Sequence, residues 1–417
     1  MMVPEEQRRF ATQIVRQLRE AGFEAYWAGG CVRDQLLGRT PKDYDIASSA
    51  TPEQIRELFG RRRTLAIGAA FGVITVLGPK PAGMVEVTTF RQDAQYSDGR
   101  HPDSVTFSSA EEDAARRDFT INGLFYDPIE QRVIDYVGGR EDLDRRVIRA
   151  IGRPEQRFAE DKLRMLRAVR FAATFDFQLE ADTAAVVRRM ADQITVVSPE
   201  RIAMEIRRML VEPCRAEAVR LLVETGLAGI LLPEIVPADD RRRESYRRAL
   251  AVLGRLREPG FPLALATLLG EFVNMDDAHE VCLRWKLSNK ETDRVDWLIE
   301  YRVAIGDAQS MPWSRLQPIL IAPGIEDLLA LNEAAAEAGI DAGVGADEVA
   351  YCRELLEQPD DQLDPPPLLT GDDLIAHGIP SGPKYRILLE HVRADQLDGS
   401  IETKAEALAL VDRLLKE

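Results

Sequence analysis

The stretch GGCVRDQLLGRTPKDYDIA, residues 29–47, decides the fold and the chemistry expected of this chain. It joins Gly29 and Gly30 to an Arg-Asp pair and then to two aspartates, Asp43 and Asp45. In an extended strand, side chains at i and i+2 project from the same face, so the two carboxylates can converge. Magnesium prefers oxygen ligands and usually takes one or two protein carboxylates, with water and substrate phosphates completing its shell. The pair therefore predicts a magnesium site.

The residues before the aspartates suit the phosphates of a nucleotide. The two glycines lack a Cβ, so their backbone can approach a triphosphate and point N–H groups at its oxygens. Arg33 adds a planar fork of donors that matches phosphate oxygens, and Asp34 is expected either to cap a helix or to orient Arg33. Each fragment alone also occurs in ordinary solvated turns. Their ordered combination indicates a nucleoside triphosphate site.

The length and composition of the chain limit which classes of protein it can belong to. At 417 residues the chain exceeds one hydrophobic core and predicts two or more domains, and 45% hydrophobic residues suffice to pack them. The charged N-terminal segment and the lack of any apolar run of about eighteen residues predict neither a signal region nor a membrane span. Four scattered cysteines fit neither a zinc ribbon nor a disulfide framework, so we expect a cytoplasmic protein.

The charge of the chain limits how it can bind nucleic acid. A formal net charge of -16 argues against a protein that coats nucleic acid through bulk electrostatics. Residues 160–220 are nearly neutral, with eleven Lys and Arg against ten Asp and Glu. If RNA binds, we expect it to bind there and by shape.

The sequence pattern changes near residue 150. Before it, runs rich in Val, Ile, Thr and Phe predict strands at AYWAGG, YDIA, FGVITVLG, MVEVTTFR, SVTFSS and RVIDYVGG, with a helix at 52–59 capped by Thr51. Beyond it, periodic apolar spacing predicts helices throughout. The expected fold class is α+β, a small mixed α/β head followed by an all-α neck, body and tail. We expect these four parts at residues 1–150, 151–212, 213–362 and 363–417.

Two further parts of the head contain residues that are candidates for catalysis or nucleotide binding. Glu86, on the strand expected beside YDIA, either joins the aspartates as a third catalytic carboxylate or points outward on an alternating strand. The segment RRDFTIN contains Arg117, Asp118 and Asn122, which combine phosphate donors with acceptors for sugar hydroxyls. Its alternative is a solvated charge cluster at a helix start.

A helix is predicted across RFAEDKLRMLRAVRF, residues 157–171, with Asp161 and Arg164 on one face. A carboxylate can accept from the exocyclic amine of cytosine or adenine while a guanidinium donates to the ring nitrogen. Uracil and guanine would instead set a carbonyl against the carboxylate. The alternative is an ordinary ion pair within a helix. Uninterrupted helix geometry would turn Arg170 by about 180° from Asp161.

Together these motifs resemble the class II branch of the polymerase-beta-like nucleotidyltransferases, which contains tRNA nucleotidyltransferases (CCA-adding enzymes) and bacterial poly(A) polymerases. The resemblance covers residues 25–210 densely, with the motifs in family order. The catalytic residues expected are Asp43, Asp45 and Glu86, with Asp43 and Asp45 as metal ligands. The nucleotide-binding residues expected are Gly29, Gly30, Arg33, Arg117, Asp118, Asn122, Asp161, Arg164, Arg167 and Arg170.

Two more stretches resemble family motifs. DYVGGREDL, residues 135–143, is similar to a hinge between head and neck, in which Gly138 and Gly139 would form the joint. VSPERIAMEIRRML, residues 197–210, resembles a motif in which Glu200 and Arg201 brace the helix that bears the base-reading aspartate.

Two features favour a CCA-adding member over a poly(A) polymerase. IGAAFGVITV, residues 67–76, matches the G-x-x-F-G pattern, and the segment from residue 368 resembles the CCA-adding tail and lacks an arginine-rich end. The polar stretch at 91–105 stands where the family has a flexible loop that helps switch from C to A addition and that is shortened in enzymes adding only C, so it favours full CCA addition.

The resemblance therefore implies addition of C, C and A to the 3′ end of tRNA. It implies CTP and ATP as substrates, two Mg²⁺ ions as cofactors and release of pyrophosphate. The A-adding or CC-adding half of a divided pathway and a poly(A) polymerase remain as alternatives. The partner expected is tRNA, held at its 3′ end and acceptor region. Neither a membrane nor an obligate protein partner is indicated.

Two other classes of protein fit less well. An RNA-binding module without catalysis would not need the D-x-D. A nucleotidyltransferase acting on small molecules would lack E-D-x-x-R and the long helical part.

Overall fold

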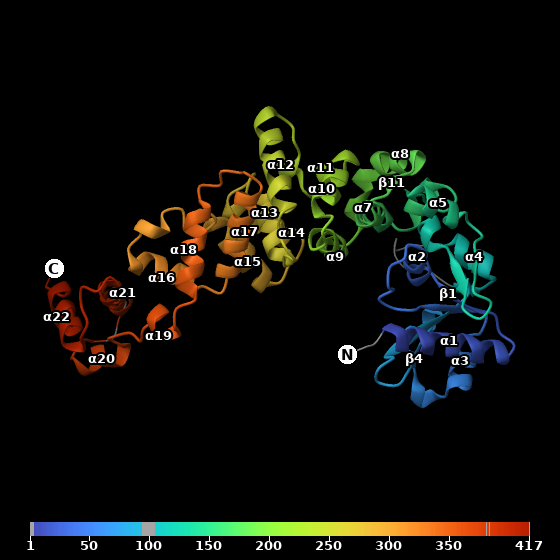
Figure 1. The fold of residues 1–417 in the computed structure, drawn as a ribbon, viewed down its shortest axis with the longest axis horizontal. Helices are drawn as coiled ribbons and strands as arrows, with labels where there is room; N and C mark the ends of the chain where they lie inside the picture. The colour runs from blue at the N-terminus through green and yellow to red at the C-terminus, as the bar shows by residue number, and fades with distance from the viewer. Residues whose placement is uncertain (1–3, 94–104, 381, 383, 417) are drawn as a thin grey trace. The chain divides into compact units, whose positions relative to one another are not determined.

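The computed structural model describes residues 4–93, 105–380, 382 and 384–416. It divides into two compact units, Met1–Pro233 and Glu234–Glu417. The α+β class is confirmed, because a mixed sheet forms the N-terminal part of the first unit and helices form nearly all the rest (Figure 1). The finer boundaries at residues 150, 212 and 362 stay predictions.

A seven-stranded sheet is the scaffold of the head. Only one neighbouring pair in it, β2 with β5, is parallel. In spatial order the strands are β3 (Thr64–Leu65), β4 (Val73–Leu77), β5 (Met84–Thr89), β2 (Ile46–Ser48), β1 (Ala25–Ala28), β8 (Phe125–Asp127) and β9 (Arg132–Ile134).

Each of the six strands predicted from the sequence is present, but two details were wrong. The strand predicted at YDIA begins only at Ile46, so Asp43 and Asp45 precede β2. Strand structure also continues past residue 150, because β10 (Val147–Ile148) pairs in parallel with β11 (Gln178–Leu179).

The loop expected at 91–105 lies largely outside the described residues. At its base, β6 (Arg91–Asp93) pairs antiparallel with β7 (Val105–Phe107).

Local sequence explains the helices that cover the sheet. The helix α1 (Pro4–Glu20) buries Phe10, Ile14 and Leu18, which are spaced by four residues and so share one face. The helix predicted at 52–59 is confirmed as α3 (Pro52–Phe59), where Thr51 and Gln54 form a reciprocal capping box.

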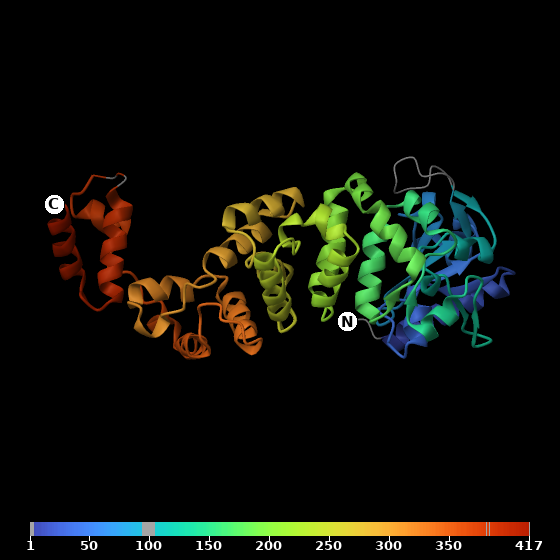
Figure 2. The same ribbon diagram turned by 90° about the horizontal axis from the view of Figure 1, so that it is seen from above.

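The remaining helices of the first unit include α7, which packs against α9 and α10 (green in Figure 2). They are α2 (Gly30–Leu36), α4 (Ala110–Ala115), α5 (Gly139–Arg145), α6 (Pro154–Glu160), α7 (Leu163–Phe175), α8 (Ala181–Met190), α9 (Pro199–Leu210), α10 (Arg215–Glu224) and α11 (Leu227–Leu231). Short 3₁₀ helices are η1 (Arg61–Arg63), η2 (Ala69–Phe71), η3 (Thr120–Asn122) and η4 (Ala191–Val196).

The single helix predicted across residues 157–171 was wrong. The chain breaks between α6 and α7, where Asp161 is extended with φ -145° and ψ 108°. Its carboxylate accepts a hydrogen bond from the amide of Leu163 at 3.0 Å. An aspartate that bonds a nearby amide in this way competes with the helix, and here it starts a new one.

All the regular secondary structure in the described residues of the second unit is helical. It comprises α12 (Asp240–Leu253), α13 (Phe261–Leu269), α14 (Met275–Arg284), α15 (Asn289–Glu300), α16 (Trp313–Leu320), α17 (Ile325–Glu337), α18 (Ala346–Leu356), α19 (Asp360–Leu363), α20 (Gly371–Ala376), α21 (Lys384–Leu397) and α22 (Lys404–Leu414), with 3₁₀ turns at η5 (Pro233–Ile235) and η6 (Ala308–Ser310). Every residue of α13 except Pro262 is buried. No described helix has the length and apolarity needed to cross a membrane.

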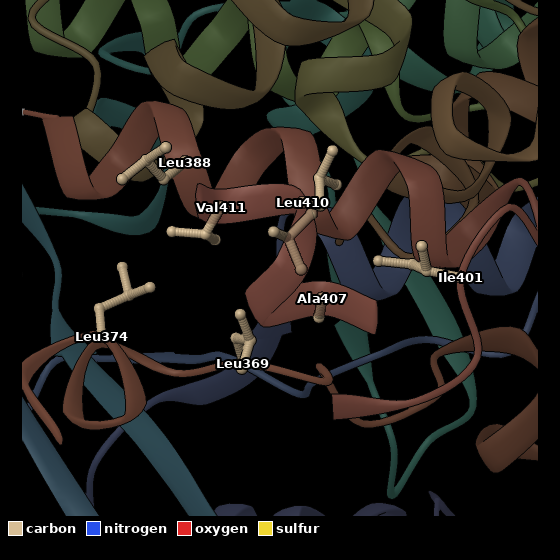
Figure 3. Packing of buried hydrophobic residues seen from close by; sticks show 8 residues of the cluster. Leu369, Leu374, Leu388, Ile401, Ala407, Leu410 and Val411 are labelled. Carbon is tan, nitrogen blue, oxygen red and sulfur yellow. The ribbon is translucent and has the colours of Figure 1, made fainter. Parts of the chain in front are cut away.

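The C-terminal helices have a hydrophobic cluster of their own. Leu374 of α20, Leu388 of α21 and Val411 of α22 are buried together (Figure 3). The three helices therefore stabilise one another.

Candidate functional site

A cavity of about 410 Å³ lies where β1 ends and β2 begins. The register of the sheet explains why the expected residues meet there. Because β2 runs parallel to β5 with Ile46 opposite Val87, Asp45 comes beside Glu86. The amide of Ala28 at the end of β1 donates to the carbonyl of Asp45 at 2.9 Å. Nine of the expected residues line this cavity: Gly29, Gly30, Arg33, Asp45, Glu86, Arg117, Asp118, Asn122 and Arg167.

The other four expected residues lie outside this lining. Asp43 is exposed two positions before Asp45, and its charge still acts on Asp45. Asp161 and Arg164 flank the break between α6 and α7, and Arg170 faces α9.

The carboxylates at the cavity repel one another. Asp45 stays open to solvent, yet its surroundings raise its pKa to about 6. Partial desolvation is the largest cause, the charges of Asp43 and Glu86 add to it, and Arg117 opposes it. A divalent cation would relieve this repulsion and return the carboxyl to its charged form.

The donor set fits magnesium. Asp43 and Asp45 offer the hard oxygens that Mg²⁺ prefers. Within the part of the chain that the structure describes, no group of three or more His, Cys, Asp or Glu side chains is suited to hold a metal ion. An ion at this pair would take its other oxygens from water or substrate phosphates, and Glu86 would act through its charge.

The backbone at Gly29 can only be glycine. Its φ is +71°, and a Cβ there would lie 2.7 Å from Nη1 of Arg117. Gly29 is followed directly by α2, so the chain turns sharply between strand and helix beside the cavity.

Arg33 is fixed by its neighbours. It donates to Oδ1 of Asn122 at 2.6 Å and to Oδ1 of Asp34 at 2.7 and 2.9 Å, and its Cζ lies 4.4 Å from the ring centroid of Phe175. Of the two roles expected for Asp34, orientation of Arg33 is therefore the one observed. The N-cap of α2 has no side-chain hydrogen bond.

Asp118 lies at the centre of a network between head and neck. It accepts from Arg167 of α7 at 2.6 and 2.9 Å and from Nδ2 of Asn122 at 3.0 Å. Burial alone would raise the pKa of Asp118, but the charge of Arg167 and these hydrogen bonds hold it well below its usual range. The alternative of a solvated cluster at RRDFTIN is wrong for Asp118, which is buried.

Asp113 is a residue that the sequence analysis missed. It is fully buried and accepts from both Arg116, at 2.7 and 2.9 Å, and Arg117, at 3.0 and 3.3 Å. Asp113, on α4, precedes these arginines by three and four residues, and that spacing is the signal that could have revealed it.

Asp161 and Arg164, the two residues expected to recognise the base, pair with other residues and not with each other. Asp161 accepts from Arg201 of α9 at 2.7 Å, so Arg201, expected to brace a helix bearing this aspartate, contacts the aspartate itself. Arg164 is paired with Glu160 and also donates to the carbonyl of Arg157 at 3.0 Å. An ion pair between Asp161 and Arg164, the alternative considered from the sequence, is therefore not formed.

Arg167 and Arg170 both lie close to the ring of Phe171. Their Cζ atoms are 5.1 and 4.1 Å from its ring centroid. Arg170 donates to the buried carboxylate of Glu205 at 2.6 Å, which directs it to α9. Arg167 is thus the member of this pair that reaches the cavity.

The glycine motif at 135–143 forms a braced turn. The carboxylate of Asp135 accepts from the amides of Val137, Gly139 and Arg140 at 3.0, 3.1 and 2.9 Å. A Cβ on Gly139 would lie 2.1 Å from the carbonyl oxygen of Thr120. The turn therefore packs tightly against η3, and hinge motion there stays a prediction.

Comparisons with known proteins agree along the whole chain. Family models match residues 25–149, as a poly A polymerase head domain, and 176–238, as a probable RNA and SrmB-binding site of polymerase A. The CCA-adding enzyme of Geobacillus thermodenitrificans is 38% identical over 314 residues, 74% of each chain. That of Lactobacillus johnsonii is 32% identical over 402 residues, 95% of each chain. The crystal structure of the Bacillus stearothermophilus CCA-adding enzyme in complex with CTP matches with a TM-score of 0.77 and 31% identity, and covers 100% of this chain and 99% of that one.

Proposed function

This chain belongs to the family of CCA-adding enzymes, and we propose that the cavity at the end of β1 is where it joins nucleotides to RNA. The protein is a tRNA nucleotidyltransferase that adds C, C and A to the 3′ end of tRNA from CTP and ATP. One observation carries the proposal for the site. The register of β2 and β5 places Asp45 beside Glu86, and both line the same cavity as the turn at Gly29.

Asp43 and Asp45 are the residues that would hold Mg²⁺. Bound there, the ions would supply a Lewis acid to the attacking hydroxyl oxygen and to the leaving pyrophosphate. The charge of Glu86 adds to the negative field that draws divalent cations to the pair.

Phosphate binding falls to the backbone at Gly29 and Gly30 and to the nearby arginines. Arg117 is held by Asp113, and Arg167 is held by Asp118. Cations fixed in advance by buried carboxylates need little reorganisation when a triphosphate enters, which is the usual source of electrostatic catalysis. Asn122 and Asp118 complete the polar wall where the sugar of the nucleotide is expected.

Choice of the base is assigned to Asp161 and Arg164. Their present partners, Arg201 and Glu160, fix the orientation of the two side chains at the break between α6 and α7. A carboxylate that accepts from an amine and a guanidinium that donates to a ring nitrogen together favour cytosine and adenine over uracil and guanine.

The alternatives are not favoured. The relatives matched over most of this chain are CCA-adding enzymes, so neither a poly(A) polymerase nor half of a divided pathway is the better description.

One assay tests the assignment of the site. Transcripts lacking CCA, CA or A are incubated with CTP, ATP or both, and the products are sequenced. Asp43→Ala should abolish addition while tRNA binding persists. The exposed Asp293→Asn, on α15, is the control for loss of one charge. Substantial turnover by Asp43→Ala would overturn the metal assignment without affecting membership of the family.

A second experiment tests base choice. Arg164→Ala should add U or G measurably while keeping C and A addition, because the donor that reads the ring nitrogen is lost. Arg189→Ala, which removes an exposed arginine paired with Glu155, is the matched control. Unchanged selectivity in Arg164→Ala would reduce its contacts to a structural role.

A further inference from the structure

The head contains a second cavity, of about 460 Å³, beside helix α1. This α1 cavity is lined by Glu5, Arg8, Arg9 and Arg16 of α1, by Trp27 of β1, and by residues of β8 and the turn after it. Small-molecule sites commonly measure about 300–1,000 Å³. The α1 cavity is therefore large enough for a ligand of nucleotide size.

The α1 cavity is separate from the catalytic one. Trp27 lines the α1 cavity, and the next residue, Ala28, lines the catalytic cavity. No residue lines both cavities, so the α1 cavity is a distinct space in the head.

The charge of the α1 cavity is positive in a strongly acidic chain. Arg8 and Arg16 are exposed, and among the described residues neither guanidinium is paired with a carboxylate. Arg9 is paired with Glu6 at 2.9 Å and more loosely with Glu5 at 4.0 Å, so the one carboxylate in the wall is partly neutralised. Three arginines against one glutamate give a local surplus of positive charge, whereas the whole chain carries -16.

Aromatic rings support these arginines. The Cζ of Arg8 lies 5.7 Å from the ring centroid of Trp27, and Trp27 stacks on Tyr126 with centroids 5.4 Å apart. The indole N–H of Trp27 is buried without a hydrogen-bond partner among the described residues. A buried donor of this kind favours an incoming acceptor.

We propose that the α1 cavity binds a polyphosphate anion, of the class formed by inorganic triphosphate and the triphosphate of a nucleotide. Arg8 and Arg16 are eight residues apart, so their backbones lie about 12 Å apart along the helix. That separation suits a ligand with several charges along its length better than a single phosphate. Guanidinium forks match phosphate oxygens in geometry and charge.

The test is calorimetric titration of the full chain with inorganic triphosphate in EDTA, which weakens metal-dependent binding at the catalytic cavity. Arg8→Ala with Arg16→Ala should weaken binding about tenfold or more, since charged hydrogen bonds are lost. Arg117→Ala, on the catalytic cavity, should retain this binding. The matched control is Arg62→Ala with Arg241→Ala, which removes two exposed arginines outside both cavities.

The outcomes separate this proposal from the function proposed above. Equal affinity in the wild type and in the Arg8 and Arg16 variant would overturn it, and so would an equal loss in the control, which would indicate bulk charge alone. Weaker tRNA binding with unchanged triphosphate binding would also overturn it, because the arginines would then contact RNA. Nucleotide addition at saturating CTP should persist in the variant, since neither arginine lines the catalytic cavity.

Discussion

At the scale of single residues, the site is built from charges that are costly to hold. Partial burial and neighbouring carboxylates raise the pKa of Asp45, whereas Arg167 and hydrogen bonds outweigh burial and lower the pKa of Asp118. The first arrangement creates affinity for a metal at the expense of stability, and the second contributes stability.

Asp45→Asn should make the metal-free protein more stable above pH 6. The folded-state pKa of about 6 exceeds the usual 3.8, so the folded state binds the proton more tightly than the unfolded state. The contribution of Asp45 to stability therefore falls as pH rises from about 4 to about 6 and stays lost above that range. Melting temperatures in EDTA at pH 4 and pH 8 check this, with Asp293→Asn as control. A lower melting temperature for Asp45→Asn at pH 8 would contradict it.

Asp118→Asn should destabilise the protein by about 2–3 kcal/mol at pH 7, because it leaves the cation of Arg167 without its partner. The depressed pKa of Asp118 means that its contribution is present above its usual pKa of about 4 and is lost as pH falls below that. Urea unfolding at pH 7 and pH 3 measures the difference in free energy of unfolding between the wild type and Asp118→Asn. This difference should be smaller at pH 3. The double variant Asp118→Asn, Arg167→Met should recover part of the loss. No recovery would mean that Arg167 is not the source of the cost.

At the scale of elements, the short 3₁₀ helix η3 links the catalytic wall to the turn at α5. It carries Asn122 and packs its Thr120 carbonyl against Gly139. A side chain at Gly139 would therefore move Asn122, which we propose to bind the nucleotide.

Two neighbouring glycines allow a matched test of this link. Gly139→Ala should cost about 3 kcal/mol, since the clash is with backbone and no rotamer relieves it. Gly138→Ala should cost only about 1 kcal/mol, because its φ of +77° is unfavourable but the space beside it is open. Denaturant unfolding gives both values, and the KM for CTP should rise only for Gly139→Ala. Equal losses of stability in the two variants would mean that the turn shifts to relieve the clash at Gly139, which would contradict the prediction.

At the scale of the whole molecule, the chain has two compact units, each with a core of its own. Because the proposed nucleotide site belongs wholly to the first unit, CTP with Mg²⁺ should stabilise the first unit more than the second.

The C-terminal helices offer a test of this separation. Leu374→Ala should destabilise them by about 3 kcal/mol, because Leu374 is fully buried in their cluster (Figure 3). Hydrogen exchange should quicken across α20, α21 and α22 and stay unchanged in the sheet of the head. The KM for tRNA should rise while the KM for CTP does not, if the predicted tail holds tRNA. The exposed Leu415→Ala is the control, and faster exchange in the head would contradict the prediction.

The sequence by itself determined the fold class, six strands of the head, the capped helix at 52–59 and the residue types of the site. These follow from local patterns, since alternation, apolar spacing and caps act over a few neighbouring residues. It did not determine the break at Asp161, because the competition between a side chain and a helix depends on which one the surroundings favour.

Only the tertiary structure decided which charges meet. The parallel register of β2 and β5 sets Asp45 beside Glu86, and packing of α7 on the head sets Arg167 on Asp118. It also pairs Asp161 with Arg201, 40 positions away, and not with Arg164. Such pairings join residues up to 49 positions apart and vary with register and packing, which no local pattern specifies. The aspartates of the opening stretch thus indicate the chemistry, and the tertiary structure determines which residues lie beside them.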